Sequence, residues 1–96
     1  MTKEEELMNF LHERVFDPIL YSKNVPSNIK RGTRCTIMRM TDRCKTADKM
    51  VHFFWSAIIQ ENAIKFSKLK KVAGLPRFED VFEEFRDKFN NKWLAE

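Results

Sequence analysis

Residues 46–73 include the most apolar stretch of the chain, and this stretch limits the folds that the chain can adopt. The ten residues Met50–Ile59 include eight apolar ones. Wound as an α-helix of about 3.6 residues per turn, they cover almost the whole circumference, which is typical of a helix in a protein interior. The run is too short to span a bilayer, which takes about 20 apolar residues. The sequence therefore predicts a buried helix over residues 46–73.

Two amphipathic helices are expected at the ends of the chain. Near the N-terminus, Thr2 and Glu5 have the spacing of a capping box, and apolar residues then line one face over residues 3–15. Asp17–Pro18 should interrupt this helix, because a proline disfavours helical geometry in the residue before it. Near the C-terminus, residues 77–94 repeat phenylalanine at intervals of four, three and four residues, with acidic residues on the opposite side.

A fourth helix is expected over residues 28–43, where the apolar side chains fall on one arc about 100° wide. Two features weaken this prediction. Gly32 costs a helix roughly 1 kcal/mol relative to alanine, and residues 33–41 include β-branched residues that favour a strand. A helix remains the preferred interpretation, because the chain has no second strand candidate with which a strand here could pair.

Together these patterns predict an all-α fold in a single domain over residues 1–96. The helices are expected to form an irregular four-helix bundle around the central apolar helix, and the short connections favour antiparallel neighbours. Gly74 is a suitable residue to end the central helix, because glycine is common just beyond a helix C-terminus. The expected helices are 3–15, 28–43, 46–73 and 77–94.

The two cysteines, Cys35 and Cys44, do not make a disulfide framework. On one continuous helix their Cα atoms would lie roughly 13 Å apart, which is too far for a bridge. We therefore expect both to be small buried side chains in a reducing compartment. Residues 1–6 are polar and acidic, unlike a signal peptide, so a cytoplasmic protein is expected.

Positive charge is concentrated in the middle of the chain. Residues 1–22 sum to −3 (two basic, five acidic) and residues 74–96 to −2 (four basic, six acidic), whereas residues 23–49 sum to +6 (eight basic, two acidic). One interpretation is that the terminal helices pack beside the central ones, so that their charges offset each other. The other interpretation is a basic face that binds anions.

The basic residues of this middle segment are candidates for binding nucleic acid. Arginine suits phosphate, because its planar guanidinium group binds two oxygens at once. The alternative is that these residues form the solvated face of an amphipathic helix, or pair with acids of the first and last helices. A helix-turn-helix outline adds little, since the second helix of the pair is the most apolar one. The candidates are Lys30, Arg31, Arg34, Arg39, Arg43, Lys45 and Lys49.

A narrow polar gap on the central helix holds His52, Ser56 and Gln60, each about one turn apart. These residues make a small-ligand pocket a minor alternative. A nucleophilic serine would also need an acid that orients the histidine and donors for an oxyanion, and the sequence has no motif that supplies them. We therefore expect no catalytic residues and no enzymatic activity.

Metal and cofactor sites have no support in the sequence. His12 and His52 lie on different expected helices, and the chain has neither a Cys-x-x-Cys nor a His-x-x-x-His pair. With two glycines in total, the chain cannot form a glycine-rich phosphate loop. We expect no cofactor, no metal and no membrane partner.

The nine phenylalanines and two tryptophans either fill one core or extend beyond it to a surface for self-association. The candidates for such a surface are Phe85, Phe89, Trp93 and Leu94, because aromatic side chains dominate protein interfaces. A homodimer would be the usual result. The leading expectation is a small non-enzymatic cytoplasmic protein that binds a protein partner, itself included. Nucleic-acid binding through residues 30–49 and a small-ligand pocket are the alternatives.

Overall fold

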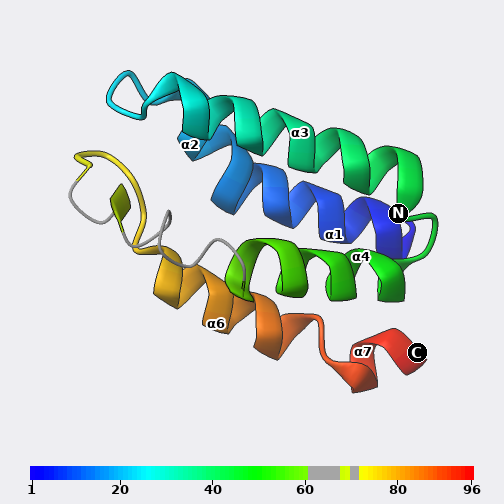
Figure 1. Cartoon of the computed structure of the whole chain (residues 1–96). Coiled ribbons are helices and arrows are strands. Elements are labelled where there is room, and N and C mark those ends of the chain that lie inside the picture. The colour runs from blue at the N-terminus through cyan, green and yellow to red at the C-terminus, as the bar shows by residue number, and fades with distance from the viewer. Residues whose placement is uncertain (61–67, 70–71) are drawn as a thin grey trace.

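The computed structural model describes residues 1–60, 68–69 and 72–96, with side chains for all of these except 58–60. Within these residues every regular element is helical and no strand is present. The helices lie side by side (Figure 1), and they pack around a buried core rich in aromatic residues. The Cα radius of gyration is 13.0 Å, the size of a compact domain of about 100 residues. The all-α fold class is therefore confirmed.

The N-terminal helical run begins at Lys3 and ends at Tyr21. The side-chain oxygen of Thr2 accepts a hydrogen bond from the backbone N–H of Glu5 at 3.1 Å. This bond confirms Thr2 as the N-cap, since it satisfies one of the free N–H groups of the first turn. The run consists of α1 (Lys3–Leu11), the π-helical segment η1 (His12–Phe16) and α2 (Asp17–Tyr21).

The helical run continues through Pro18, so the expected interruption at Asp17–Pro18 is wrong. Asp17 keeps helical dihedral angles (φ −63°, ψ −44°), and its N–H donates to the carbonyl of His12, five residues back. A wider π-helical turn therefore precedes the proline. Pro18 falls in the first turn of α2, where a missing N–H donor costs the helix nothing.

The helix expected in the basic segment is present as α3 (Ser27–Arg43), and the alternative of a strand over residues 33–41 is excluded. Its threonines adapt to helical geometry by side-chain hydrogen bonds. The hydroxyls of Thr33, Thr36 and Thr41 each donate to the backbone carbonyl four residues back, at 2.9 Å. These bonds satisfy hydroxyl groups that could otherwise compete with the helix.

The first part of the expected central helix is α4 (Ala47–Phe54), which continues as the π-helical segment η2 (Trp55–Gln60). The second part was expected to reach residue 73. Residues 61–67 and 70–71 lie outside the described residues, and most of the second part falls there.

The chain has left the helix before Gly74. Val72 and Ala73 form a bend and a turn, so the expected end of the central helix at residue 73 is too late. Gly74 has a positive φ of 87°. This is the left-handed geometry that makes glycine common after a helix.

The expected helix over residues 77–94 is two helices, α6 (Phe78–Lys88) and α7 (Asn91–Ala95). Phe89 leaves the α-helical region (φ −106°, ψ 53°). The side chain of Asn90 then accepts a backbone N–H from the first turn of α7 at 2.9 Å. Asparagine is a strong N-cap, so it starts a new helix here, and the expectation of one continuous helix is wrong.

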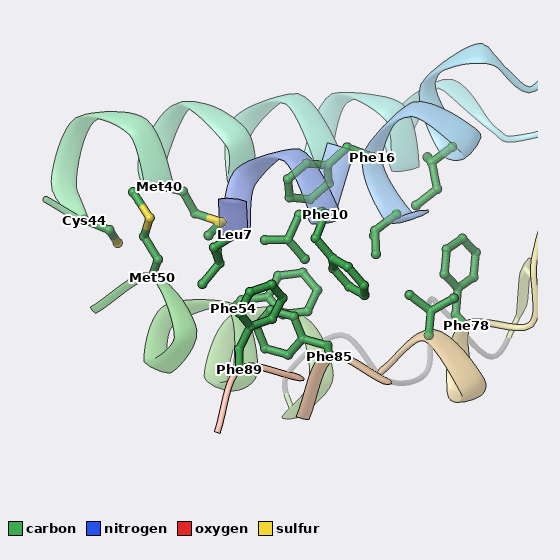
Figure 2. Close-up of a cluster of buried hydrophobic side chains, with 14 of the residues drawn as sticks. Leu7, Phe10, Phe16, Met40, Cys44, Met50, Phe54, Phe78, Phe85 and Phe89 are labelled. Atoms are coloured by element: carbon green, nitrogen blue, oxygen red, sulfur yellow. The ribbon is translucent and has the colours of Figure 1, made fainter. Parts of the chain in front are cut away.

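The N-terminal run and α4 share the centre of the fold. α1 packs against α4, α2 against α3, and η1 against α6. Phe54 of α4 is completely buried, and its ring centroid lies 4.7 Å from that of Phe85 and 6.4 Å from that of Phe16. Figure 2 shows Phe54 among these rings and those of Phe10 and Phe89. One aromatic core therefore joins the N-terminal run, α4 and α6.

In the described structure, one side of α4 is covered and the other is open. Ala47, Met50 and Phe54 are buried, whereas Val51 and Phe53 are partly exposed. The sequence predicted burial on nearly every side, because an apolar surface does not reveal how many neighbours a helix has. α1 and α6 cover the inner side, and the outer side is available for a binding site.

Candidate functional site

A groove of about 840 Å³ lies over the open side of α4. α4 and the start of η2 form its floor. The larger apolar side chains of this floor are Val51, Phe53 and Trp55. Arg39 of α3 and Leu94 of α7 stand at its edges. The groove therefore reaches from α3 to α7 across the outer side of α4.

Residues from three separate predictions meet in this groove. Arg39 and Lys49 come from the basic segment, His52 and Ser56 from the polar gap, and Leu94 from the expected self-association surface. In the sequence these residues belong to unrelated patterns. The tertiary structure brings them to one place.

His52 and Ser56 of the polar gap line the groove. His52 is exposed and Ser56 is partly buried, and the side chain of Gln60, the third candidate, lies outside the described residues. The two described residues offer hydrogen-bond donors and acceptors at the surface of the groove.

Asp48 contributes negative charge to the groove. A hydrogen bond with the side chain of Thr46 is the main cause that lowers the pKa of Asp48 below its ordinary value, and the charge of Lys49 acts in the same direction. Asp48 is therefore a carboxylate at neutral pH. Two cations, Arg39 and Lys49, and this one acid line the described part of the groove, so its charge is positive by one.

Trp55 is a groove residue that the sequence pattern assigned to a buried helix. It is partly exposed and, in the described part of the chain, does not pack against the core as Val51 and Phe53 do. The sequence holds a signal for this position. Asp48, His52 and Trp55 are spaced by four and three residues, so they share one face of a helix. A tryptophan beside polar residues is typical of a binding surface, because its ring is large and its N–H is polar.

The basic segment is exposed and lacks ion pairs. Arg31, Arg34, Arg39 and Arg43 are exposed on α3, and the ion pairs among the described residues include no residue of 30–49. Lys30 is partly buried, and Lys45 and Lys49 are exposed. The contacts therefore do not support the interpretation in which acids of the terminal helices offset this segment.

The charged side chains of the terminal helices instead pair with one another. Arg14 of the N-terminal run forms a double ion pair with Glu84 of α6, with nitrogen–oxygen distances of 2.8 and 2.9 Å. Lys88 of α6 lies 4.0 Å from the carboxylate of Glu6. Both pairs connect α6 to the N-terminal run, and neither includes a residue of α3.

The two phenylalanines of the expected self-association surface belong to the core. Phe85 and Phe89 are 1% and 2% exposed, so they cannot form a surface of the folded chain. Trp93 packs on Phe89 with ring centroids 4.7 Å apart. The Lys3 ammonium donates to the carbonyls of Trp93 and Leu94 at 2.8 and 3.1 Å, which fastens α7 to the N-terminus. Of the four candidates, Leu94 lines the groove.

The two cysteines have different environments. Cys44 is buried as expected, and burial raises the pKa of its thiol, while the charge of Lys49 acts in the opposite direction. Cys35 is exposed, so the expectation of a buried side chain is wrong for this residue. It lies on the outer face of α3, beside exposed arginines that the core does not reach.

Other kinds of site are not evident in the described residues. Among them, no group of three or more His, Cys, Asp or Glu side chains is placed to hold a metal ion. No helix in the same part of the chain is long and apolar enough to cross a membrane. Comparison of the chain with known protein families, with curated proteins and with solved structures finds no match.

Proposed function

We propose that this chain is a non-enzymatic cytoplasmic protein that binds nucleic acid through the phosphate backbone. The binding surface is the solvent-facing side of α3. Lys30, Arg31 and Arg34 lie toward one flank of its apolar stripe, and Arg39 and Arg43 lie toward the other. We call these five residues the basic face. The supporting observation is that these cations lack ion pairs among the described residues. A surface that keeps its charges unpaired is available to an outside polyanion.

The spacing of these cations supports the proposal. Lys30 and Arg34, like Arg39 and Arg43, are four residues apart, so each pair places two positive charges on the same side of α3. Such a pair destabilises a helix by roughly 0.2–0.5 kcal/mol. Asp42, three residues after Arg39, is the one acid in the sequence of α3, so the helix itself offsets only part of this repulsion. A partner with regularly spaced negative charges would remove it.

Nucleic acid fits the basic face better than a protein does. Four of the five residues are arginines, whose planar groups bind phosphate oxygens in pairs. Protein interfaces need an apolar centre, whereas Met38 is the one large apolar side chain of α3 that is mostly exposed, at 63%. From Arg31 to Arg43 the helix extends about 18 Å. A duplex carries about ten phosphate charges over that length.

Self-association stays a prediction. Two of its four candidate residues, Phe85 and Phe89, belong to the core, which weakens its support. The cytoplasmic location and the lack of enzymatic activity stay predictions from the sequence.

Binding to labelled oligonucleotides over a series of salt concentrations tests the proposal. If four or five cations contact phosphates, the logarithm of the affinity should fall against the logarithm of the salt concentration with a slope of about −2.8 to −4.5. The double variant Arg31→Gln/Arg34→Gln removes two contacts and should reduce this slope by about 1.4–1.8. No binding at low salt would contradict the proposal.

A matched control separates a specific face from net charge. The double variant Arg77→Gln/Arg86→Gln removes the same charge from exposed positions before and on α6. We expect it to bind with nearly the affinity and slope of the unmodified chain. Equal weakening by both double variants would mean that overall charge, rather than the basic face of α3, attracts the oligonucleotide.

A further inference from the structure

The groove over α4 continues from the basic face of α3. Arg39 belongs to both, and Lys49 adds a second cation on the floor of the groove. Phe53 and Trp55, whose rings are partly exposed, and the exposed imidazole of His52 also line the groove. The groove therefore combines positive charge with aromatic surface.

We propose that the groove binds unstacked bases, so that the partner of this protein is single-stranded nucleic acid. This inference rests on the proposed function. Aromatic rings next to cations are the features by which proteins bind single strands, because each base can stack on a ring while the cations hold the phosphates. In a duplex the bases are stacked on one another and cannot reach Trp55.

The polar residues of the groove fit the edges of a base. Asp48 is a carboxylate that can accept hydrogen bonds from N–H groups on the edge of an unpaired base, such as the amino group of cytosine or the imino group of thymine and uracil. His52 and Ser56 can donate and accept. The volume of about 840 Å³ lies in the range of sites for drug-sized ligands, the size class of a nucleotide.

A second copy of this chain is a less suitable occupant of the groove. An isologous dimer places the same patch of both copies face to face. Each patch holds Arg39 and Lys49 with one Asp48, so two patches in contact would bring together four cations and two acids. Like charges in contact disfavour an interface. A phosphate backbone has the charge that these residues lack.

Intrinsic fluorescence tests this inference directly. The chain has two tryptophans, so the variant Trp93→Phe leaves Trp55 as the single reporter. An oligo-dT and an oligo-U of about 20 nucleotides, longer than typical single-strand sites, should both quench it. Preference for one would identify the strand as DNA or RNA. A duplex of the same length should bind without quenching. Equal quenching by the duplex would overturn the inference.

Substitution of Trp55 provides an independent measurement. Trp55→Leu keeps an apolar side chain but removes the ring, and should weaken binding to the single strand by about 5- to 150-fold, with little change for the duplex. Trp55→Phe keeps a ring and should retain most of the affinity. Tyr21→Leu is the matched control, since Tyr21 is an aromatic residue that is 81% exposed on α2; it should bind normally.

The outcomes separate this inference from the proposed function. If neither single strand nor duplex binds, the proposed function fails. If both bind equally and Trp55→Leu changes neither, the basic face binds nucleic acid and the groove does not. Light scattering on the same samples tests the other candidate occupant of the groove, a second copy of the chain. A dimer that Trp55→Leu converts to a monomer, with unchanged oligonucleotide binding, would assign the groove to self-association and overturn the inference.

Discussion

α3 and α6 both cover the N-terminal helical run, but the core holds them to different extents. α6 buries Phe78, Val81 and Phe85, whereas the one buried residue of α3 is Met40. Ile37 and its neighbours on α3 are partly exposed. α6 is therefore anchored by several large side chains, and α3 by a narrow apolar seam.

The two helices also differ in whether their charged side chains have partners. Glu84 and Lys88 of α6 interact with Arg14 and Glu6 of the N-terminal run, and the ammonium of Lys88 lies 5.5 Å from the centre of the Phe10 ring. The arginines of α3 have no such partners among the described residues. The comparison indicates that charge on α6 contributes to the fold, while charge on α3 is available for binding.

The largest expected effect comes from the core of α6. Phe85→Ala should lower the free energy of unfolding by about 3–5 kcal/mol, because it removes a buried ring and leaves a cavity. Ile37→Ala on α3 should lower it by only about 1–2 kcal/mol, since that side chain is partly rather than fully buried. Urea denaturation measures both. Equal losses would show that α3 is anchored as firmly as α6.

Replacement of the exposed Gly32 by alanine should stabilise α3. A methyl group at Gly32 would meet no atom within 4 Å, so Gly32→Ala should raise the free energy of unfolding by about 0.4–1 kcal/mol. Gly74→Ala is the control, because its φ of 87° is strained for alanine, and it should destabilise. Thermal unfolding compares the two. No gain at Gly32 would indicate a backbone at this position that differs from a regular helix.

The ion pair of α6 should contribute less than the core. Arg14 and Glu84 are roughly two-fifths exposed, so water screens their interaction, and Glu84→Gln should cost about 0.2–1 kcal/mol. A double-mutant cycle with Arg14→Gln isolates the pairwise energy. This energy should shrink at high salt. A coupling that is absent at low salt would remove the distinction between the charges of α6 and those of α3.

Loss of charge from α3 should leave the fold intact. Arg34→Gln removes a like-charge neighbour of Lys30 and should change the free energy of unfolding by no more than about 0.5 kcal/mol, in the stabilising direction. The same variant should weaken oligonucleotide binding. A marked destabilisation would show that Arg34 has a structural role.

The smallest effect is expected from the thiol at the end of α3. Burial raises the pKa of Cys44, so the folded state holds this proton more tightly than the unfolded state. Its contribution to stability is complete below about pH 8.5, the ordinary thiol pKa, and is lost as pH rises through the folded value. Above that pH, the free energy of unfolding of Cys44→Ala should therefore fall less steeply than that of the unmodified chain. Cys35→Ala, at an exposed position, is the control and should have the same pH dependence as the unmodified chain.

Local patterns predicted the helices well where one residue type recurs at helical spacing. The stripe that includes Phe78 and Phe85 is buried as its period indicates. The break at Asn90 and the π-helical turn before Pro18 were missed, because each depends on competition between two backbone arrangements. The C-terminal part of the helix expected over 46–73 lies partly outside the described residues.

The candidate site was predicted in pieces and not as a site. Arg39, Lys49 and His52 were named as candidates, but for separate functions. Trp55 was missed, because an apolar residue inside an apolar run gives little indication of which side of the helix the core will cover. Phe85 was assigned to a surface for the same reason.

The sequence by itself determined the fold class, the helical stripes and the concentration of cations in residues 23–49, because these features depend on residues close together in the chain. The tertiary structure decided which side of α4 is open, which charges are paired and which residues meet in the groove. These depend on which helices become neighbours. That choice is made by packing between distant segments, such as Phe54 against Phe85, which no local pattern contains.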